Sequence, residues 1–309
     1  MTKIPIFLLQ SIRYYGIVCL LSIVTFQIDA QVSDLARIEY TYFPQRDSDN
    51  SFKRLRTFIN VPIKIGDKGT FLVPGIEYRG VYFDYEDAAS FDVEGLENFR
   101  SLEVSIGYTF KMKNDWRFAI KTGAMFASNF ERDKLISDDY LYSGALYFLK
   151  NKTKDTTISK PWRLIVGLQY STTAGRPFPL PFVNYFKRFH PDWTYTVGVP
   201  KSNLKYFFDP KNIVQAFATL DGFYANIQNN RVVEGAGTID EKIANSISMT
   251  IALAGLGYEH YFTKHLVFYS YAGFTILNDI RLRDDKQEDV LTVNDSNSAY
   301  IRAGLKFKI

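Results

Sequence analysis

The stretch Ala299-Tyr-Ile-Arg-Ala-Gly-Leu-Lys-Phe-Lys-Ile309 alternates apolar and polar side chains along its length. Because successive side chains of an extended chain point to opposite faces, one face carries Ile301 and Leu305 and the other carries Arg302 and Lys306. The same alternation recurs along most of the chain, without a helical apolar stripe to cover such faces. The pattern predicts the all-β class and a closed antiparallel transmembrane β-barrel with its apolar face toward lipid.

The first thirty residues have a different character. Lys3 and Arg13 supply positive charge, residues 16–26 form a short apolar run, and Ile28-Asp-Ala30 ends the segment. A secretory signal peptide has these three sections, and the run is about half of the roughly 20 residues of a membrane-spanning helix. We therefore expect residues 1–30 to be a removed signal peptide and residues 31–309 to form the barrel domain, with an uncleaved interfacial anchor as the alternative.

The composition supports an exported barrel. Phe, Tyr and Trp make up 16% of the chain, and after residue 30 no run of 18 apolar residues occurs. The only cysteine, Cys19, lies in the expected signal peptide, so the mature chain would have no disulfide and no cysteine metal site. The net charge of +4 is too small an excess to indicate a nucleic-acid partner. These features favour the bacterial outer membrane as the location, with its lipid, its lipopolysaccharide and the barrel-assembly machinery as partners.

The clearest pair of strands flanks Lys113-Asn-Asp115. If Met112 faces Trp116 across this three-residue turn, every apolar position of one strand meets an apolar position of the other. The polar positions then coincide as well, so the register and the turn length agree, as a hairpin requires. The apolar positions are Leu102, Val104, Ile106, Tyr108 and Phe110 on the first strand and Phe118, Ile120, Thr122, Ala124 and Phe126 on the second.

The whole chain yields about twelve strands, with ten or fourteen as alternatives. Besides this hairpin, strand-like segments lie at 34–45, 53–65, 70–85, 140–150, 162–173, 192–200, 212–226, 246–262, 265–280 and 297–309. Short connections alternate with longer ones, as periplasmic turns alternate with external loops. An even count places both termini of the barrel domain in the periplasm. Within 246–262 the apolar positions change parity, which predicts a bulge near Gly255 or Gly257.

These strand ends resemble those of the outer-membrane β-barrel proteins of unknown function found in Bacteroidetes-type bacteria. The resemblance rests on the Ala30-Gln31 junction, on Trp193-Thr-Tyr-Thr-Val-Gly-Val-Pro200 with Leu204-Lys-Tyr-Phe-Phe208, and on Gly304-Leu-Lys-Phe-Lys-Ile309. It covers the whole mature chain and implies a Gram-negative outer-membrane barrel. The terminal residue is Ile309, where the usual assembly signal has an aromatic residue. The resemblance implies no catalytic or ligand residues.

Strand parity places eight basic and four acidic side chains inside the barrel. Two interpretations stay open: a polar pore that favours anions, or a lattice of cross-strand ion pairs that fills the lumen. Closure of the barrel should bring Glu39 near Arg302 or Lys306. The expected lumen residues are Arg37, Glu39, Arg54, Arg56, Glu77, Arg79, Glu103, Lys121, Arg163, Asp221, Arg302 and Lys306.

The segment from Gly175 to Pro191 is unusually rich in aromatic residues and proline for an external loop. It could constrict the barrel mouth, present a binding surface, or simply pack over neighbouring loops. The residues for constriction or binding are Arg176, Phe178, Phe182, Tyr185 and Phe186. Arg176, Lys187, Arg188 and His190 could also contact lipopolysaccharide.

No catalytic residue, cofactor or metal site is expected. The chain has only three histidines, His190, His260 and His265, and no nucleophile motif surrounds Ser270 near the latter two. A barrel hydrolase of the lipase type is therefore the weakest alternative. Ser137-Asp-Asp139 and Arg283-Asp-Asp-Lys286 lack the alternating oxygen ligands of a calcium loop.

The sequence thus predicts a porin-like outer-membrane barrel that acts as a channel or transporter for small solutes. The alternative is a non-conducting structural or binding barrel that acts through its external loops. The solute cannot be read from the residues.

Overall fold

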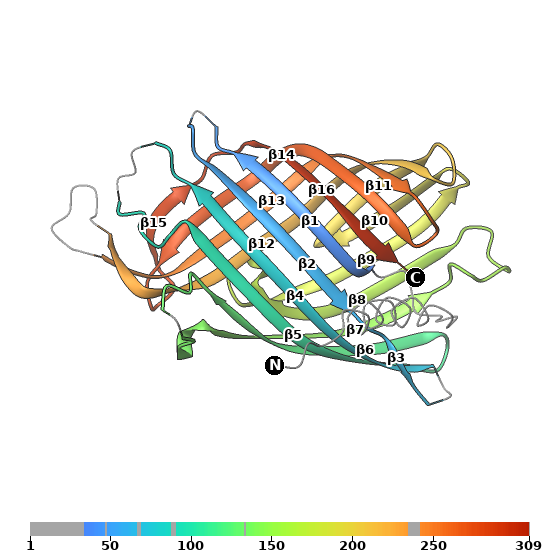
Figure 1. Cartoon of the computed structure of the whole chain (residues 1–309). Helices are drawn as coiled ribbons and strands as arrows, with labels where there is room; N and C mark the ends of the chain where they lie inside the picture. The colour runs from blue at the N-terminus through green and yellow to red at the C-terminus, as the bar shows by residue number, and fades with distance from the viewer. Residues whose placement is uncertain are drawn as a thin grey trace, which may run out of the picture.

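The computed structural model describes residues 34–46, 48–66, 69–87, 91–132, 134–233 and 242–308. Within these ranges the chain forms sixteen strands of one sheet and two 3-10 helices (Figure 1). The expected signal peptide lies outside the described residues. The elements are β1 (Asp34–Pro44), β2 (Ser51–Asn60), β3 (Ile63–Ile65), β4 (Thr70–Asp84), β5 (Asn98–Lys111), β6 (Trp116–Ser128), η2 (Ser137–Asp139), β7 (Tyr140–Asn151), β8 (Trp162–Ser171), η3 (Thr172–Ala174), β9 (Phe178–His190), β10 (Trp193–Val199), β11 (Lys201–Phe207), β12 (Asn212–Val233), β13 (Lys242–Tyr261), β14 (Leu266–Arg283), β15 (Asp289–Asn294) and β16 (Ala299–Lys308).

The sheet closes where β1 pairs antiparallel with β16, as Figure 1 shows. Since β3 pairs only with β4 and β15 only with β14, fourteen strands of the described chain form the closed circuit. The expected closed antiparallel barrel is confirmed, but the count of twelve is wrong. Among the described residues, no helix combines the length and the apolar character needed to cross a membrane. We call the end where β1 begins and β16 ends the proximal end, and the opposite end the distal end.

The two additional strands are β9 and β11, which lie where the sequence suggested connections. The prolines of β9 are the reason that it was missed. Pro179 and Pro181 pair with β8, but β10 reaches only Val183 of β9, so the prolines lie on an open edge where no backbone N–H is required. β11 follows β10 after Pro200 alone, and such a short connection leaves no turn signal between two strands of seven residues.

The predicted hairpin is confirmed. β5 and β6 pair in the expected register, with Lys111 opposite Arg117. The turn is closed by the Met112 backbone N–H, which donates to the Trp116 carbonyl at 2.7 Å. Leu102, Val104 and Ile106 are exposed on the outer face, as the alternation requires.

The barrel is narrower at its distal end because its strands differ in length. β10 and β11 have seven residues each, whereas β12 has 22 and continues far beyond its last β11 partner, Thr219. Further along, Asn226 of β12 pairs directly with Ser128 of β6. η3 packs against β12 at Gly222, where an added Cβ would lie 2.5 Å from the Thr173 carbonyl oxygen. The ends of β7 to β11 are thereby excluded from the distal circuit.

The outer face carries an apolar band, with exposed side chains such as Ile38, Ile76, Leu204, Leu256 and Ile301.

The predicted bulge near Gly255 or Gly257 in β13 is wrong. The apolar residues of β13 change parity because the inner face of the barrel changes from polar to apolar along this strand. Ile247, Met249 and Ile251 are fully buried, while Leu256 and Tyr258 are exposed. The parity of β13 is therefore constant: the first group faces inward and the second outward. The register shift lies at Ala252/Leu253, away from Gly255 and Gly257.

Candidate functional site

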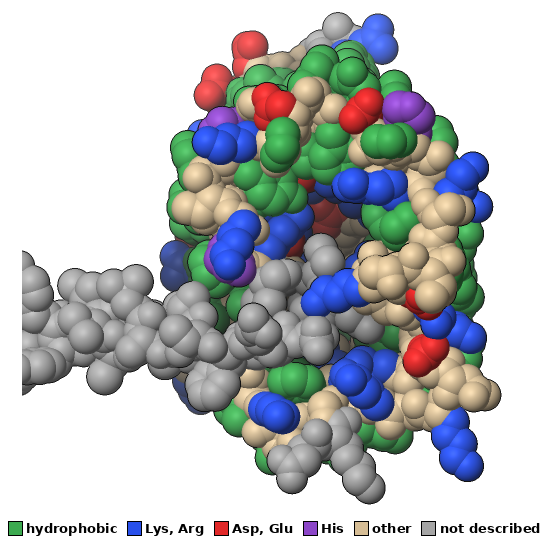
Figure 2. Space-filling model, turned by 90° about the vertical axis from the view of Figure 1, so that its right-hand side faces the viewer, with side chains coloured by type: hydrophobic (Ala, Val, Ile, Leu, Met, Phe, Trp, Pro, Cys, Tyr) green, Lys and Arg blue, Asp and Glu red, His purple; other side chains and the backbone are tan. Residues whose placement is uncertain are grey.

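The proximal half of the barrel encloses a cavity of about 880 Å³, which we call the chamber. Figure 2 views the proximal end and shows a hollow with basic side chains along its wall and acidic ones inside. Of the twelve charged residues expected in the lumen, eleven line the chamber directly. Arg54 is the exception, since it is 2% exposed and lies behind the lining against Asp221.

Asp221 of β12 connects strands that are not neighbours in the sheet. Its carboxylate accepts hydrogen bonds from Arg54 of β2 at 2.6 Å and from Arg302 of β16 at 3.0 Å. Arg79 of β4 donates to the carbonyl of the next residue, Gly222, at 3.2 Å. These contacts link opposite walls at the distal limit of the chamber.

The expected contact across the barrel seam is confirmed. Glu39 of β1 lies 3.6 Å from the Nε of Arg302, and Thr41 is the direct β-sheet partner of Arg302. The Tyr269 hydroxyl donates to Glu39 at 2.6 Å. This seam is buried, since Glu39 is 2% exposed, so charge and hydrogen bonding must be satisfied together.

Two further carboxylates each bind two cations. Glu77 accepts from Arg56 at 2.9 Å and also pairs with Arg79. Glu259 of β13 accepts from Lys205 and Lys306 at 2.9 and 2.7 Å. A third carboxylate, Glu103, lies 3.2 Å from the Nζ of Lys121, which is 43% exposed.

The inner face of β8 to β11 differs, because these four strands contain no Asp or Glu. We call this face the acid-free wall. Apart from Lys205, its inward cations stand over aromatic rings: Arg163 is 5.7 Å from the Phe186 ring centre, and Arg188 is 5.1 Å from that of Phe207. The Nζ of Lys201 is 5.1 Å from the Phe217 ring centre and 4.8 Å from that of Tyr271.

Apolar side chains fill the distal half, and we call this cluster the distal seal. They come from β1, β2, β4, β5, β6, β12, β13, β14 and β16, so they meet from all sides of the narrower circuit. The rings of Phe43 and Phe52 stack with centres 4.2 Å apart, and Phe52 and Met249 are 0% exposed. Nearby, burial raises the pKa of the Tyr85 hydroxyl above its ordinary value. The members are Phe43, Phe52, Val81, Phe83, Phe99, Ala127, Phe223, Ala225, Ile227, Ile247, Met249, Ile251, Ile280, Leu282 and Tyr300.

At the proximal rim, the connection between β7 and β8 carries an exposed charged cluster. Lys152 bonds to Asp115 and Asp155 at 2.6 and 2.9 Å. Hydrogen bonds from Thr157 and Lys152 lower the pKa of Asp155 to about 2. The rim is therefore charged at any ordinary pH.

The expected aromatic loop is wrong, because residues 178–190 form strand β9. Phe186 lines the chamber, and Phe182 packs edge-on against the chamber residue Tyr147. Tyr185 lies instead on the outer side, against Trp162 and Tyr195. Arg176 precedes β9 and is exposed, as is Phe178. The four aromatic residues therefore belong to the wall rather than to a loop folded into the mouth.

The three histidines contact groups other than a nucleophile. The Nδ1 of His260 is 2.9 Å from Asn212 Oδ1, and the Nδ1 of His265 is 2.8 Å from the carbonyl oxygen of Lys308. His190 lies beside Asp192. Among the described residues, no group of three or more His, Cys, Asp or Glu side chains is arranged to hold a metal ion.

Sequence reasoning missed Lys201, Lys205 and Glu259, which also line the chamber. The two lysines were assigned to a connection, although Leu204 and Tyr206 alternate with them. Glu259 could have been found from its neighbour, because Tyr258 lies on the outer face and successive side chains of a strand point to opposite faces.

The fold and the site together define a class: a closed antiparallel barrel with an outer apolar band, a charged chamber and an apolar distal seal. The chain belongs to the family described as "Domain of unknown function (DUF6268)", whose model matches residues 26–308.

Solved structures with similar folds include several barrels. The NanC porin aligns with 89% of this chain and 100% of its own, at 10% identity and a TM-score of 0.38. A TodX mutant, titled a monoaromatic hydrocarbon channel, covers 89% and 90% at 10% identity and 0.38. LpxR from Salmonella typhimurium covers 89% and 100% at 11% identity and 0.36. These scores indicate distant resemblance only. No curated protein matches the sequence.

Proposed function

We propose that the protein is an outer-membrane barrel that binds small solutes in a chamber open to the periplasm and sealed toward the cell surface. The observation that carries this proposal is the distal seal, since Phe52, Ile247 and Met249 are fully buried beyond the polar chamber. Water and ions do not pass readily through a close-packed apolar plug. The barrel would therefore not conduct in this conformation.

The orientation follows from the connections. In outer-membrane barrels the short turns and the start of the first and end of the last strand lie in the periplasm, and the longer loops face outward. The proximal end carries tight turns such as 112–115 and 191–192, and the distal end carries 85–97 and 129–139. The resemblance of the strand ends to Bacteroidetes-type barrels supports the same membrane. This proposal keeps the non-conducting alternative but places the solute inside the barrel rather than on external loops.

A second candidate function is a gated channel or transporter for small solutes. It is favoured by the charged lining of the chamber, because charged side chains line the polar path of a channel. The two functions differ in whether the distal seal opens.

Conductance in planar bilayers separates these functions. The wild-type protein should show no steady conductance, whereas Phe223→Ser with Met249→Ser should conduct because polar, smaller side chains let water enter the seal. The matched control is Tyr147→Ser with Phe182→Ser, which removes two large side chains from the hollow half and should stay silent. Steady wild-type conductance would contradict the sealed chamber and favour the channel.

The orientation can be tested by labelling single introduced cysteines, because a mature chain without Cys19 has no cysteine of its own. In whole cells, a membrane-impermeant maleimide should label Asp49→Cys in the distal connection 45–50. It should not label Lys113→Cys in the proximal turn until the outer membrane is broken. The reverse labelling pattern would overturn the proposed orientation.

A further inference from the structure

The chamber distributes its charges unevenly. Eleven basic and six acidic residues line it, and every one of the six acidic residues lies outside β8 to β11. Each of these carboxylates has a cation within 4 Å, as described above for Asp221, Glu77 and Glu259 and as Asp34 has in Arg37. The negative charges of the chamber are thus already neutralised.

Three cations of the acid-free wall have no such neutralisation. Among the described residues, no carboxylate lies within ion-pair distance of Arg163, Arg188 or Lys201. Arg163 donates one long hydrogen bond of 3.4 Å to Asn184, and its Nε is buried without a partner. The Nζ of Lys201 lies over the rings of Phe217 and Tyr271. Arg163 and Lys201 are half-buried, and a cation partly withdrawn from water without an anion is costly, so their retention points to a partner that arrives from outside.

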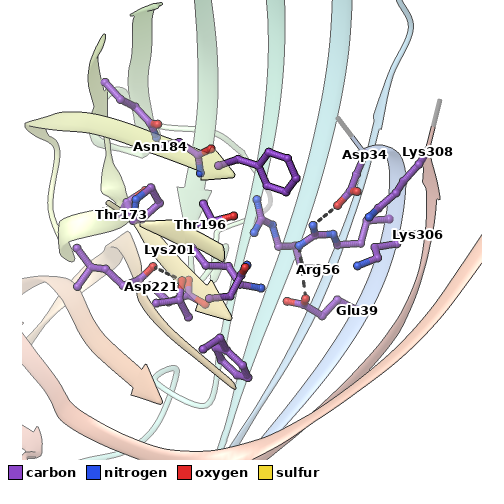
Figure 3. Close-up of a pocket in the computed structure, with 18 of the residues that line it drawn as sticks. Asp34, Glu39, Arg56, Thr173, Asn184, Thr196, Lys201, Asp221, Lys306 and Lys308 are labelled. Atoms are coloured by element: carbon purple, nitrogen blue, oxygen red, sulfur yellow. Dashed lines mark hydrogen bonds and ion pairs between the residues drawn. The ribbon is translucent and has the colours of Figure 1, made fainter. Parts of the chain in front are cut away.

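Neutral polar groups surround these cations. Asn184, Thr196 and Asn203 line the chamber beside them, and Asn203 Oδ1 is buried without a hydrogen bond. Figure 3 shows Asn184, Thr196 and Lys201 on one side of the cavity, across from Glu39 and Lys306. Amide and hydroxyl groups suit ligand hydroxyls, while arginine and lysine suit a carboxylate or phosphate.

We propose that Arg163, Lys201 and Asn203 form a binding site for a small polyhydroxylated organic anion of the sugar-acid type. Arg163 and Lys201 bind the negative group, and Asn203 accepts a hydrogen bond from a hydroxyl. Arg188, nearer the proximal mouth, attracts the anion into the chamber. A volume of about 880 Å³ is within the range of small-ligand sites. This inference rests on the proposed function, whose solute it specifies.

The test is calorimetry on the full-length mature barrel in detergent, with D-gluconate, D-glucose and acetate as probes. Gluconate should bind, and its affinity should fall as NaCl is raised. Glucose lacks the charge and acetate lacks the hydroxyls, so each should bind far more weakly. Removing both cations in Arg163→Gln with Lys201→Gln should weaken gluconate binding by about tenfold or more.

The matched control is Lys187→Gln, since Lys187 lies on β9 next to Arg188 but points to the outer face. It should leave gluconate binding unchanged. The double variant should also resist urea at least as well as the wild-type, because it removes cations that have no protein anion.

Equal gluconate binding by the double variant and the wild-type would overturn the inference, and so would equal binding of glucose or the absence of gluconate binding. These outcomes are independent of the conductance and labelling tests, because binding is measured in detergent without a membrane. A sealed, correctly oriented barrel that binds no gluconate would disprove only the anion site. A conducting barrel that binds gluconate would disprove only the sealed chamber.

Discussion

The two halves of the lumen share most of their strands yet have opposite interiors. Along β12, the inward residues Thr219 and Asp221 belong to the chamber, and the next ones, Phe223 and Ala225, belong to the distal seal. The difference follows the circuit, which narrows where β12 reaches β6. A wide circuit leaves space that water and ions fill, whereas a narrow one brings side chains into contact, and close-packed side chains are most stable when apolar. Strand parity therefore decides which residues face inward, and barrel width decides what they do there.

The boundary between the halves should be the most sensitive position. Asp221→Ala removes the carboxylate to which the buried Arg54 and Arg302 both donate and leaves them only the more distant Glu39, so the free energy of unfolding should fall by about 3–5 kcal/mol. Urea titration of the barrel in lipid vesicles, followed by tryptophan fluorescence, measures this loss. Asp115→Ala, which breaks an exposed pair with Lys152 at the rim, should cost little. Equal losses would mean that the boundary ion pairs are no more important than surface ones.

The distal seal should behave as a protein core. Met249→Ala creates a cavity among fully buried neighbours and should lower the free energy of unfolding by about 2–5 kcal/mol in the same titration. Met112→Ala, at an exposed position beside the proximal turn, is the matched control and should have a much smaller effect. A seal that tolerated Met249→Ala as well as the rim tolerates Met112→Ala would not be close-packed.

The outer band should respond alike in both halves, because the proposed membrane location puts it against lipid in each. Leu256, which is 71% exposed on β13, should not tolerate a charge. Leu256→Arg should lower the free energy of unfolding by about 2–4 kcal/mol if this position lies near the bilayer midplane. Leu256→Ala separates the loss of the side chain from the added charge. No penalty for arginine in lipid vesicles would argue against membrane burial of this face.

The smallest effect should come from the solvated part of the chamber. Lys121 pairs with Glu103 but is 43% exposed, so Lys121→Gln should cost about 0–1 kcal/mol. Lys306→Gln, which removes a 6% exposed partner of Glu259, should cost distinctly more. A reversed order would show that the chamber is drier near Lys121 than its exposure indicates.

Much of the wall could be predicted from local pattern. The hairpin around Met112 and Trp116 and the seam between Glu39 and Arg302 follow from alternation and from the need to close the sheet. β9 could not be recognised, because its prolines are compatible with a strand only if one edge is unpaired. That condition depends on where β10 ends, which no local pattern reveals.

The sequence by itself determined a closed antiparallel barrel and the inward direction of its charged residues, because a two-residue period fixes which side chains share a face. Only the tertiary structure decided that Ile247, Met249 and Ile251 form an internal seal rather than part of the outer band. An apolar side chain is as favourable in a packed lumen as in lipid, so hydrophobicity alone cannot distinguish the two faces. The lengths of β10, β11 and β12 resolve the choice, since they set where the barrel narrows and the chamber ends.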